Sequence, residues 1–199
     1  MGRSDVKVQF ISDEVVADDD FIVTAARPNT AATLANTAFA SGGARVLSVT
    51  TAGTSDNGKS NTIVGTDVFD NVITEVITST GSAENVDGAK YFKTVTSVTS
   101  SAQFAGNIIV GSLATAAQAV FGGPVRLKGY SIVSGGTAGV IEFVDGTPED
   151  GTVLFKARTI GTDNTTLDNT IPDEGILFQS GLSIKYTVGT IDMMNFFYA

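Results

Sequence analysis

The sequence predicts an all-β protein made of two small sandwich modules. Short segments in which apolar and polar residues alternate recur along its 199 residues, as they do in half-buried strands. Gly, Asn and Asp residues, which favour turns, separate these segments at short intervals. No long pattern typical of an amphipathic helix interrupts them. Hydrophobic residues make up 42% and charged residues 17% of the chain, so the chain can form a core, unlike a disordered protein.

The first module has the less regular strand pattern. Its expected strands are residues 6–10, 21–24, 45–51, 61–65, 71–79, 91–100 and 106–111. Residues 12–20 are expected to form an acidic turn, and residues 81–88 a turn that contains Gly. Because it contains Pro28, the segment 27–41 is expected to be a loop or a weak edge strand. The Ala-rich segment 112–121 allows either one or two helical turns or an extended connector.

The second module follows Gly122, Gly123 and Pro124, a combination that marks a boundary. We therefore divide the chain into a first module with an N-terminal arm, residues 1–121, and a second module, residues 122–199. The expected strands of the second module are residues 125–129, 140–144, 153–158, 182–188 and 191–198. Several short strands in so few residues predict a sandwich or a jelly roll.

One strand of the second module has a clear expected inner face. Val153, Phe155 and Ala157 alternate with the charged residues Lys156 and Arg158. Because successive side chains of a strand point to opposite faces, the three apolar residues are expected to face the core and the two charged ones the solvent.

Composition excludes several classes of function. The net charge is −9, from 12 basic and 21 acidic residues, whereas binding to phosphate backbones depends on Lys and Arg. We therefore expect no nucleic-acid partner. The chain has no Cys and no His, which excludes thiol and imidazole chemistry and the metal sites built on them. No apolar run approaches the roughly 18 residues of a membrane span, and we expect no membrane partner, no catalytic residue, no metal and no cofactor.

One motif matches a phosphate-binding loop. Gly53, Gly58, Lys59 and Ser60 fit the pattern G-x-x-x-x-G-K-[ST]. Such a loop needs a helix that starts directly after it, because the helix N-terminus helps to bind the phosphate. Residues 61–66 are instead rich in β-branched residues and include a Gly, which favours a strand. We interpret the motif as a hairpin turn built on an Asp-Asn-Gly sequence; the alternative is a nucleotide-binding enzyme.

Two acidic clusters are candidate cation sites. Their members are Asp13, Glu14, Asp18, Asp19 and Asp20 in the first cluster and Asp145, Glu149 and Asp150 in the second. Ca²⁺ binds about six to eight oxygen atoms, but neither spacing fits a known calcium loop. We favour solvated loops, and leave a cation that bridges two subunits as the alternative.

Three aromatic residues, Phe196, Phe197 and Tyr198, lie next to the C-terminal residue. At least one of them is expected in the core, where a terminal strand ties down the chain end. A contact between subunits stays open for the others, because exposed aromatic residues anchor interfaces.

Several segments are similar to modules of virus particles. Residues 90–99 (KYFKTVTSVT) and 105–111 (AGNIIVG), together with 49–53 and 63–67, resemble an Ig-like module in small virion proteins of tailed bacteriophages. In the second module, the segments that resemble a domain common in marine and cyanobacterial phage particles are 126–130, 141–146 and 171–178. The resemblance implies an Ig-like first module, whereas the jelly-roll-like second module is the expectation from its strand pattern. The family pattern carries no catalytic residues, so none are transferred.

This resemblance implies a virion structural protein and no enzyme. We expect a capsid decoration (cement) protein on the capsid surface, which stabilises the head by bridging subunits of the major capsid protein. Because such assemblies are symmetric, self-association is expected as well, as a homotrimer in preference to a dimer. The alternative is a tail or fibre component that contributes to binding of a host receptor through exposed loops or aromatic residues.

Overall fold

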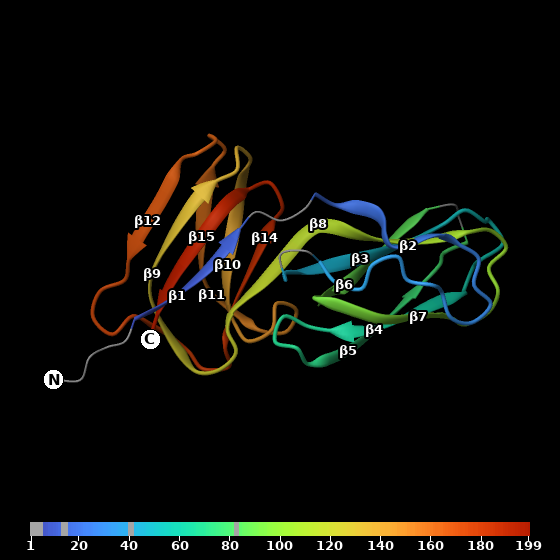
Figure 1. The fold of residues 1–199 in the computed structure, drawn as a ribbon, viewed down its shortest axis with the longest axis horizontal. Helices are drawn as coiled ribbons and strands as arrows, with labels where there is room; N and C mark the ends of the chain where they lie inside the picture. Colours follow the sequence, from blue (N-terminus) through green and yellow to red (C-terminus); the bar gives the residue numbers. More distant parts are fainter. Residues whose placement is uncertain (1–5, 13–15, 40–41, 82–83) are drawn as a thin grey trace. The chain divides into compact units, whose positions relative to one another are not determined.

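The computed structural model describes residues 6–12, 16–39, 42–81 and 84–199. All regular elements in these residues are β-strands, which confirms the predicted all-β class. The strands, drawn in Figure 1, are β1 (Lys7–Ser12), β2 (Asp18–Ala26), β3 (Ala44–Thr51), β4 (Ser60–Thr66), β5 (Val72–Thr78), β6 (Asn85–Phe92), β7 (Thr94–Ser100), β8 (Ile108–Phe121), β9 (Val125–Ser134), β10 (Ala138–Asp145), β11 (Thr152–Ile160), β12 (Thr166–Thr170), β13 (Ile176–Phe178), β14 (Leu182–Thr187) and β15 (Ile191–Tyr198).

The chain divides into two compact units, which are described separately. The central unit is Ala17–Ala116, and the terminal unit combines the chain up to Val16 with Ala117–Ala199. The division expected between residues 121 and 122 differs from this one in two respects. The dividing point lies inside β8, and β1 belongs with the second half of the chain because it pairs along its whole length with β15.

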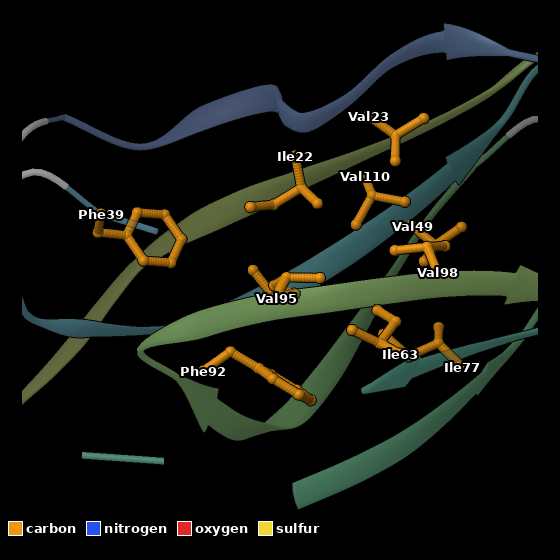
Figure 2. Packing of buried hydrophobic residues seen from close by; sticks show 11 residues of the cluster. Ile22, Val23, Phe39, Val49, Ile63, Ile77, Phe92, Val95, Val98 and Val110 are labelled. Carbon is orange, nitrogen blue, oxygen red and sulfur yellow. The ribbon is translucent and has the colours of Figure 1, made fainter. Parts of the chain in front are cut away.

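Two sheets pack against each other in the central unit. One sheet contains β6, β3 and the first part of β8, with β2 also paired to β8, and the other has the order β5-β4-β7. Val49 and Val110 of the first sheet share one buried cluster with Ile63 and Val98 of the second (Figure 2). The core of this unit therefore lies between the two sheets, as in a sandwich.

Gly65 allows β4 and β7 to approach each other closely. A Cβ atom at this position would overlap the backbone carbonyl oxygen of Thr94. The register of the two strands shifts between Val64 and Gly65. A side chain at residue 65 would consequently force the strands of the three-stranded sheet apart.

The terminal unit also contains two sheets. One has the order β1-β15-β9-β12, with β13 paired to β9 beyond the end of β12, and the other contains β11, β10, β14 and the last part of β8. Figure 1 shows β12, β9, β15 and β1 side by side. Aromatic rings from both sheets fill the space between them: Phe143 stacks on Phe155 with ring centres 4.0 Å apart and meets Phe196 edge-on at 5.8 Å.

The inner face expected for β11 is confirmed. Ala157 is buried, Val153 and Phe155 are partly buried, and Lys156 and Arg158 are exposed. The aromatic run at the end of the chain also divides between two faces, because Phe196 is fully buried whereas Phe197 is exposed.

Two expectations for the first half of the chain are wrong. Residues 85–88, the second half of the expected turn, belong to β6, and the single strand expected over residues 91–100 is divided at Lys93 between β6 and β7, which lie in different sheets. The Ala-rich segment 112–121 forms no helical turn; it is extended, which was the other alternative, and continues β8 across the division between the units, with Ala116 and Ala117 fully buried. Small residues fit here because strand preference depends on packing against neighbours more than on the residue itself.

Candidate attachment surface

The outer face of the β1-β15-β9 sheet carries a strip of exposed apolar side chains. The members of this strip, called the apolar strip below, are Val6, Val8, Phe10, Met193 and Phe197, which are 47, 54, 55, 41 and 36% exposed. Val8 lies opposite Phe197 in the pairing of β1 with β15, and Ser12 lies opposite Met193. The strip therefore extends over two neighbouring strands.

The strip exists because the face of β1 that carries Val8 and Phe10 points to the solvent and not to the core. The pattern of residues 6–10 predicts a half-buried strand, and burial of its apolar side is the arrangement expected for such a pattern. In the structure Ile11 is buried and Gln9 half-buried, whereas Val8 and Phe10 on the other face are exposed. The adjacent strand β15 has apolar residues on both faces, since Met194 and Phe196 are buried behind Met193 and Phe197.

An open groove lies next to the apolar strip. Its volume is about 530 Å³, and its lining includes Val6 and Phe197 on one side and Asp168 and Thr170 on the other. Gly129 of β9 pairs with Phe197 of β15 on one side and with Thr170 of β12 on the other. Because glycine has no side chain, the space between Phe197 and Thr170 is not filled. The missing side chain explains why the surface is hollow at this point.

The outer face of the opposite sheet is charged instead. Glu142 binds Lys156 at 2.6 Å and Lys185 at 3.0 Å, and these residues lie opposite each other in register. Hydrogen bonds from the two lysines, opposed in part by burial, hold the pKa of Glu142 below its ordinary value. Leu154 and Ile160 are exposed on β11 as well, but Lys156 and Arg158 separate them, so they form no continuous strip.

The phosphate-loop motif lies in a loop between two sheets of the central unit. The strand that follows it, β4, starts at Ser60, so the chain continues as a strand where a phosphate-binding loop needs a helix. The preceding strand β3 pairs with β6, whereas β4 pairs with β5 and β7. The interpretation as a hairpin turn is therefore corrected: the strands on either side of the loop are not paired with each other.

The residues of this motif have structural roles. Gly58 has a φ of 76°, a conformation that favours glycine, and a Cβ atom on Gly53 would lie 2.5 Å from Asp56 Oδ2. Lys59 Nζ donates to Asp56 Oδ1 at 2.8 Å and to the carbonyl oxygen of Gln103 at 2.7 Å. The Lys59 ammonium group is thus already bound to protein oxygen atoms.

Asp56 joins this loop to the segment before β8. The side chain is fully buried, and its Oδ1 also accepts a hydrogen bond from the Ala105 N–H at 2.7 Å. Burial raises the pKa of Asp56, but the hydrogen bonds from Lys59 and Ala105 and the charge of Lys59 outweigh it, so the pKa lies below its ordinary value. The carboxylate is accordingly held in its charged form.

The acidic clusters do not form a metal centre in the part of the chain that is described. Asp13 and Glu14 lie outside the described residues, and Asp20 is part of β2, where a hydrogen bond with Asp18, burial and the Asp18 charge raise its pKa. Asp145 and Asp150 line a shallow cavity of about 320 Å³, and Asp145 Oδ1 accepts the Ser180 N–H at 2.6 Å. Within these described ranges, no group of three or more carboxylates is arranged to hold a metal ion.

Comparison with known proteins adds no relative to these observations. No protein-family model, no curated protein and no solved structure matches the chain. Among the described residues, no helix has the length and apolar character needed to cross a lipid bilayer. Among the described residues, we take the apolar strip and its groove as the candidate functional surface.

Neither the apolar strip as a whole nor the groove was predicted from the sequence, although a subunit contact was left open for Phe197. The alternation in residues 6–10 was informative about the strand but not about its orientation, which follows from the pairing of β1 with β15 across nearly the whole chain. The groove depends on Gly129, whose neighbours on β15 and β12 are also distant in sequence. The local signal for the strip was the presence of apolar residues on both faces of β15. A strand with one face on the core and the other in water usually has polar residues on its outer face.

Proposed function

We propose that the chain is a bacteriophage virion structural protein, a decoration (cement) protein that stabilises the head by bridging subunits of the major capsid protein. The observation that carries the proposal is the apolar strip, which gives the terminal unit a surface suited to attachment. The resemblance of both halves of the sequence to virion modules supports the same role. The capsid surface is the proposed location.

The apolar strip has the chemistry of an interface core. Large apolar and aromatic side chains are typical of the centre of protein interfaces, and Phe10, Met193 and Phe197 belong to these residue types. Each of the five side chains is roughly half exposed, so covering each one contributes about 1 kcal/mol. A standard interface buries about 800 Å² on each partner, and the strip together with its surroundings would form the centre of such an area.

Contacts repeated over a symmetric shell would reinforce one another. A decoration protein that touches two capsid subunits holds them together by the interface it buries with both. Its net charge of −9 disfavours contact with DNA, which is consistent with a position on the outside of the shell.

Capsid binding by strip variants tests the proposal. Purified capsids that lack the chain are mixed with wild-type protein, with Phe197→Lys or with Val72→Lys, and co-sedimentation is measured. Val72 is an exposed residue of β5 in the central unit and serves as the matched control. We expect wild type and Val72→Lys to sediment with capsids and Phe197→Lys to remain in the supernatant. Equal binding by all three proteins would contradict attachment through the strip.

The groove favours a second candidate function, a tail or fibre component that binds a host receptor. Its apolar wall at Phe197 faces polar side chains such as Asp168, and its volume is within the range of about 300–1,000 Å³ that is usual for ligand sites. Quantitative mass spectrometry of purified particles separates the two roles. A shell protein is present in hundreds of copies and a tail component in about a dozen or fewer.

A further inference from the structure

Proteins protect the edge strands of their sheets against pairing with other chains, and several edges of this chain are protected. The usual devices are bulges, charged residues, short strands and coverage by other segments. In β11, Phe155 pairs with Phe143 and Val153 with Val144, so Leu154 is an extra residue that interrupts the ladder. The same strand exposes charged residues at its edge. The pairing of β2 with β8 is interrupted twice.

The edges of β5 and β6 protect each other. The Glu75 carboxylate on β5 accepts hydrogen bonds from the backbone N–H of Ala89 at 2.6 Å and of Lys90 at 3.3 Å. A Cβ atom on Gly88 would lie 2.6 Å from Glu75 Oε2, so the glycine makes room for the carboxylate. The remaining edge of the β1-β15-β9-β12 sheet is formed by β12, which has five residues and includes Asp168 and Asn169, and by β13, which has three.

Among the described residues, the edge of β1 has no bulge, no covering strand and no charged residue except Lys7 at one end. Its six residues pair with β15 in unbroken register, from Lys7 opposite Tyr198 to Ser12 opposite Met193. It contains no Pro, its single charge is Lys7 at one end, and no described strand pairs with its other edge. Within the described part of the chain, a side-chain hydrogen bond to its backbone runs from Gln9 Nε2 to the Phe10 carbonyl oxygen at 3.3 Å.

We propose that β1 pairs with β1 of a second copy of this chain, antiparallel and about a two-fold axis at Gln9. Residues opposite each other in an antiparallel pair point to the same face, so the exposed face of β1 must continue into the exposed face of its partner. Centring the pair on Gln9 meets this condition and places Val8 of each copy opposite Phe10 of the other. The two sheets then form one continuous sheet, and the two apolar strips become neighbours.

A second copy fits this edge because the strand is complementary to itself. The pairing makes two contacts between a β-branched and an aromatic residue, a favourable combination across strands. The two Lys7 residues lie about 13 Å apart along the strands, beyond the screening length of about 8 Å at physiological salt. A two-fold pair makes a dimer, in place of the homotrimer expected from the sequence. The inference goes beyond the proposed virion role and does not depend on it.

Disulfide trapping tests both the pairing and its register. The chain has no Cys, so Gln9→Cys introduces a single thiol. At the two-fold axis the Cα atoms of the two residues would be about 4.5–5.5 Å apart, which suits a disulfide. Two copies of Phe10→Cys would have their Cα atoms about 8 Å apart, too far for a disulfide without backbone movement. Val76→Cys, on the exposed face of β5, is the control for random collision.

On mild oxidation we expect Gln9→Cys to form a covalent dimer on a non-reducing gel while Phe10→Cys and Val76→Cys stay mainly monomeric. Crosslinking of Gln9→Cys no faster than that of Val76→Cys would overturn the pairing. Faster crosslinking of Phe10→Cys than of Gln9→Cys would overturn the register.

Sedimentation equilibrium provides a second, independent measurement. We expect a concentration-dependent dimer for wild type and for Val76→Lys, and a monomer for Phe10→Lys, whose exposed side chain can be replaced without disturbing the core. Added salt should strengthen the dimer, because it screens repulsion between two chains of charge −9. A monomeric or trimeric wild type would refute the proposal. Either result leaves the capsid-binding measurement unaffected, so the two proposals fail separately.

Discussion

Replacing Lys59 with alanine should destabilise the central unit by about 2–3 kcal/mol. The change removes the cation that donates to Asp56 Oδ1 at 2.8 Å and to the Gln103 carbonyl oxygen at 2.7 Å. Asp56 is fully buried and keeps its hydrogen bond from Ala105 but loses its ion pair. The variant therefore contains a buried carboxylate without a counter-charge.

The magnitude follows from the exposure of the two partners. A hydrogen bond to a charged group contributes about 1.5–3 kcal/mol, and breaking a fully buried ion pair costs about 3–5 kcal/mol. Because the Lys59 side chain is 25% exposed, water compensates part of the loss, and the lower range applies. In a unit of about 100 residues, each 1 kcal/mol shifts the melting temperature by about 4–8 °C. We expect a decrease of about 8–24 °C in the transition of the central unit.

The effect should depend on pH. Burial raises the pKa of Asp56, but the Lys59 and Ala105 hydrogen bonds and the Lys59 charge lower it further, so the folded pKa lies below the ordinary value. A group of this kind stabilises the fold above its unfolded pKa, about 3.9 for Asp, and the stabilisation is lost as the pH falls through the folded pKa. The difference between wild type and Lys59→Ala should consequently be largest near pH 7 and decrease below about pH 4.

Urea unfolding of wild type, Lys59→Ala, Asp56→Ala and the double variant at pH 7 and pH 3 measures these quantities. We expect a coupling energy of at least about 1 kcal/mol between the two residues at pH 7. Unchanged stability of Lys59→Ala at pH 7 would refute the structural role of the ion pair. So would a rise in the wild-type melting temperature with Mg²⁺ and ATP that is absent in Lys59→Ala, because Lys59 would then bind phosphate.

Three further substitutions test the fold. Gly65→Ala should destabilise the central unit by about 3 kcal/mol in urea unfolding, because the added Cβ atom overlaps the Thr94 carbonyl oxygen; a loss below about 0.5 kcal/mol would contradict the close approach of β4 and β7. Glu75→Ala should lower the stability by about 1 kcal/mol, because the Ala89 N–H loses its acceptor. Light scattering should also show faster aggregation on warming, because the edge of β6 is no longer covered. Unchanged scattering would argue against edge protection. Glu142→Gln should lower the stability by about 0.5–1 kcal/mol at pH 7. Because the pKa of Glu142 is lowered in the folded state, its ion pairs stabilise the fold above about pH 4, and the loss should disappear once Glu142 is protonated. A loss that is equal at pH 3 and pH 7 would contradict the ion pairs.

The strands of this protein are predictable where the local pattern and the packing agree. β11 alternates strictly, and its buried and exposed residues are those that the sequence predicts. β6 was missed because Asp87 and Gly88, which favour turns, lie within it. Gly88 occurs in this strand because it leaves room for the Glu75 carboxylate, a neighbour that no local pattern identifies.

The candidate surface was less predictable than the fold. Whether Val8 and Phe10 face the core or the solvent depends on the pairing of β1 with β15, two strands at opposite ends of the chain. The same holds for Asp56, which was expected in a hairpin turn and which is fully buried, where the Ala105 N–H of a distant loop donates to it. In each case a contact between residues far apart in sequence decides the environment of the side chain.

The decisive test of the proposed role is a reconstruction, by electron cryomicroscopy, of the particle that the chain is proposed to decorate. We expect density for the chain on the outer shell, with the β1-β15 face of the terminal unit in contact with capsid subunits and Phe197 inside the contact. Particles with no density for the chain, or with that face directed toward solvent, would contradict it.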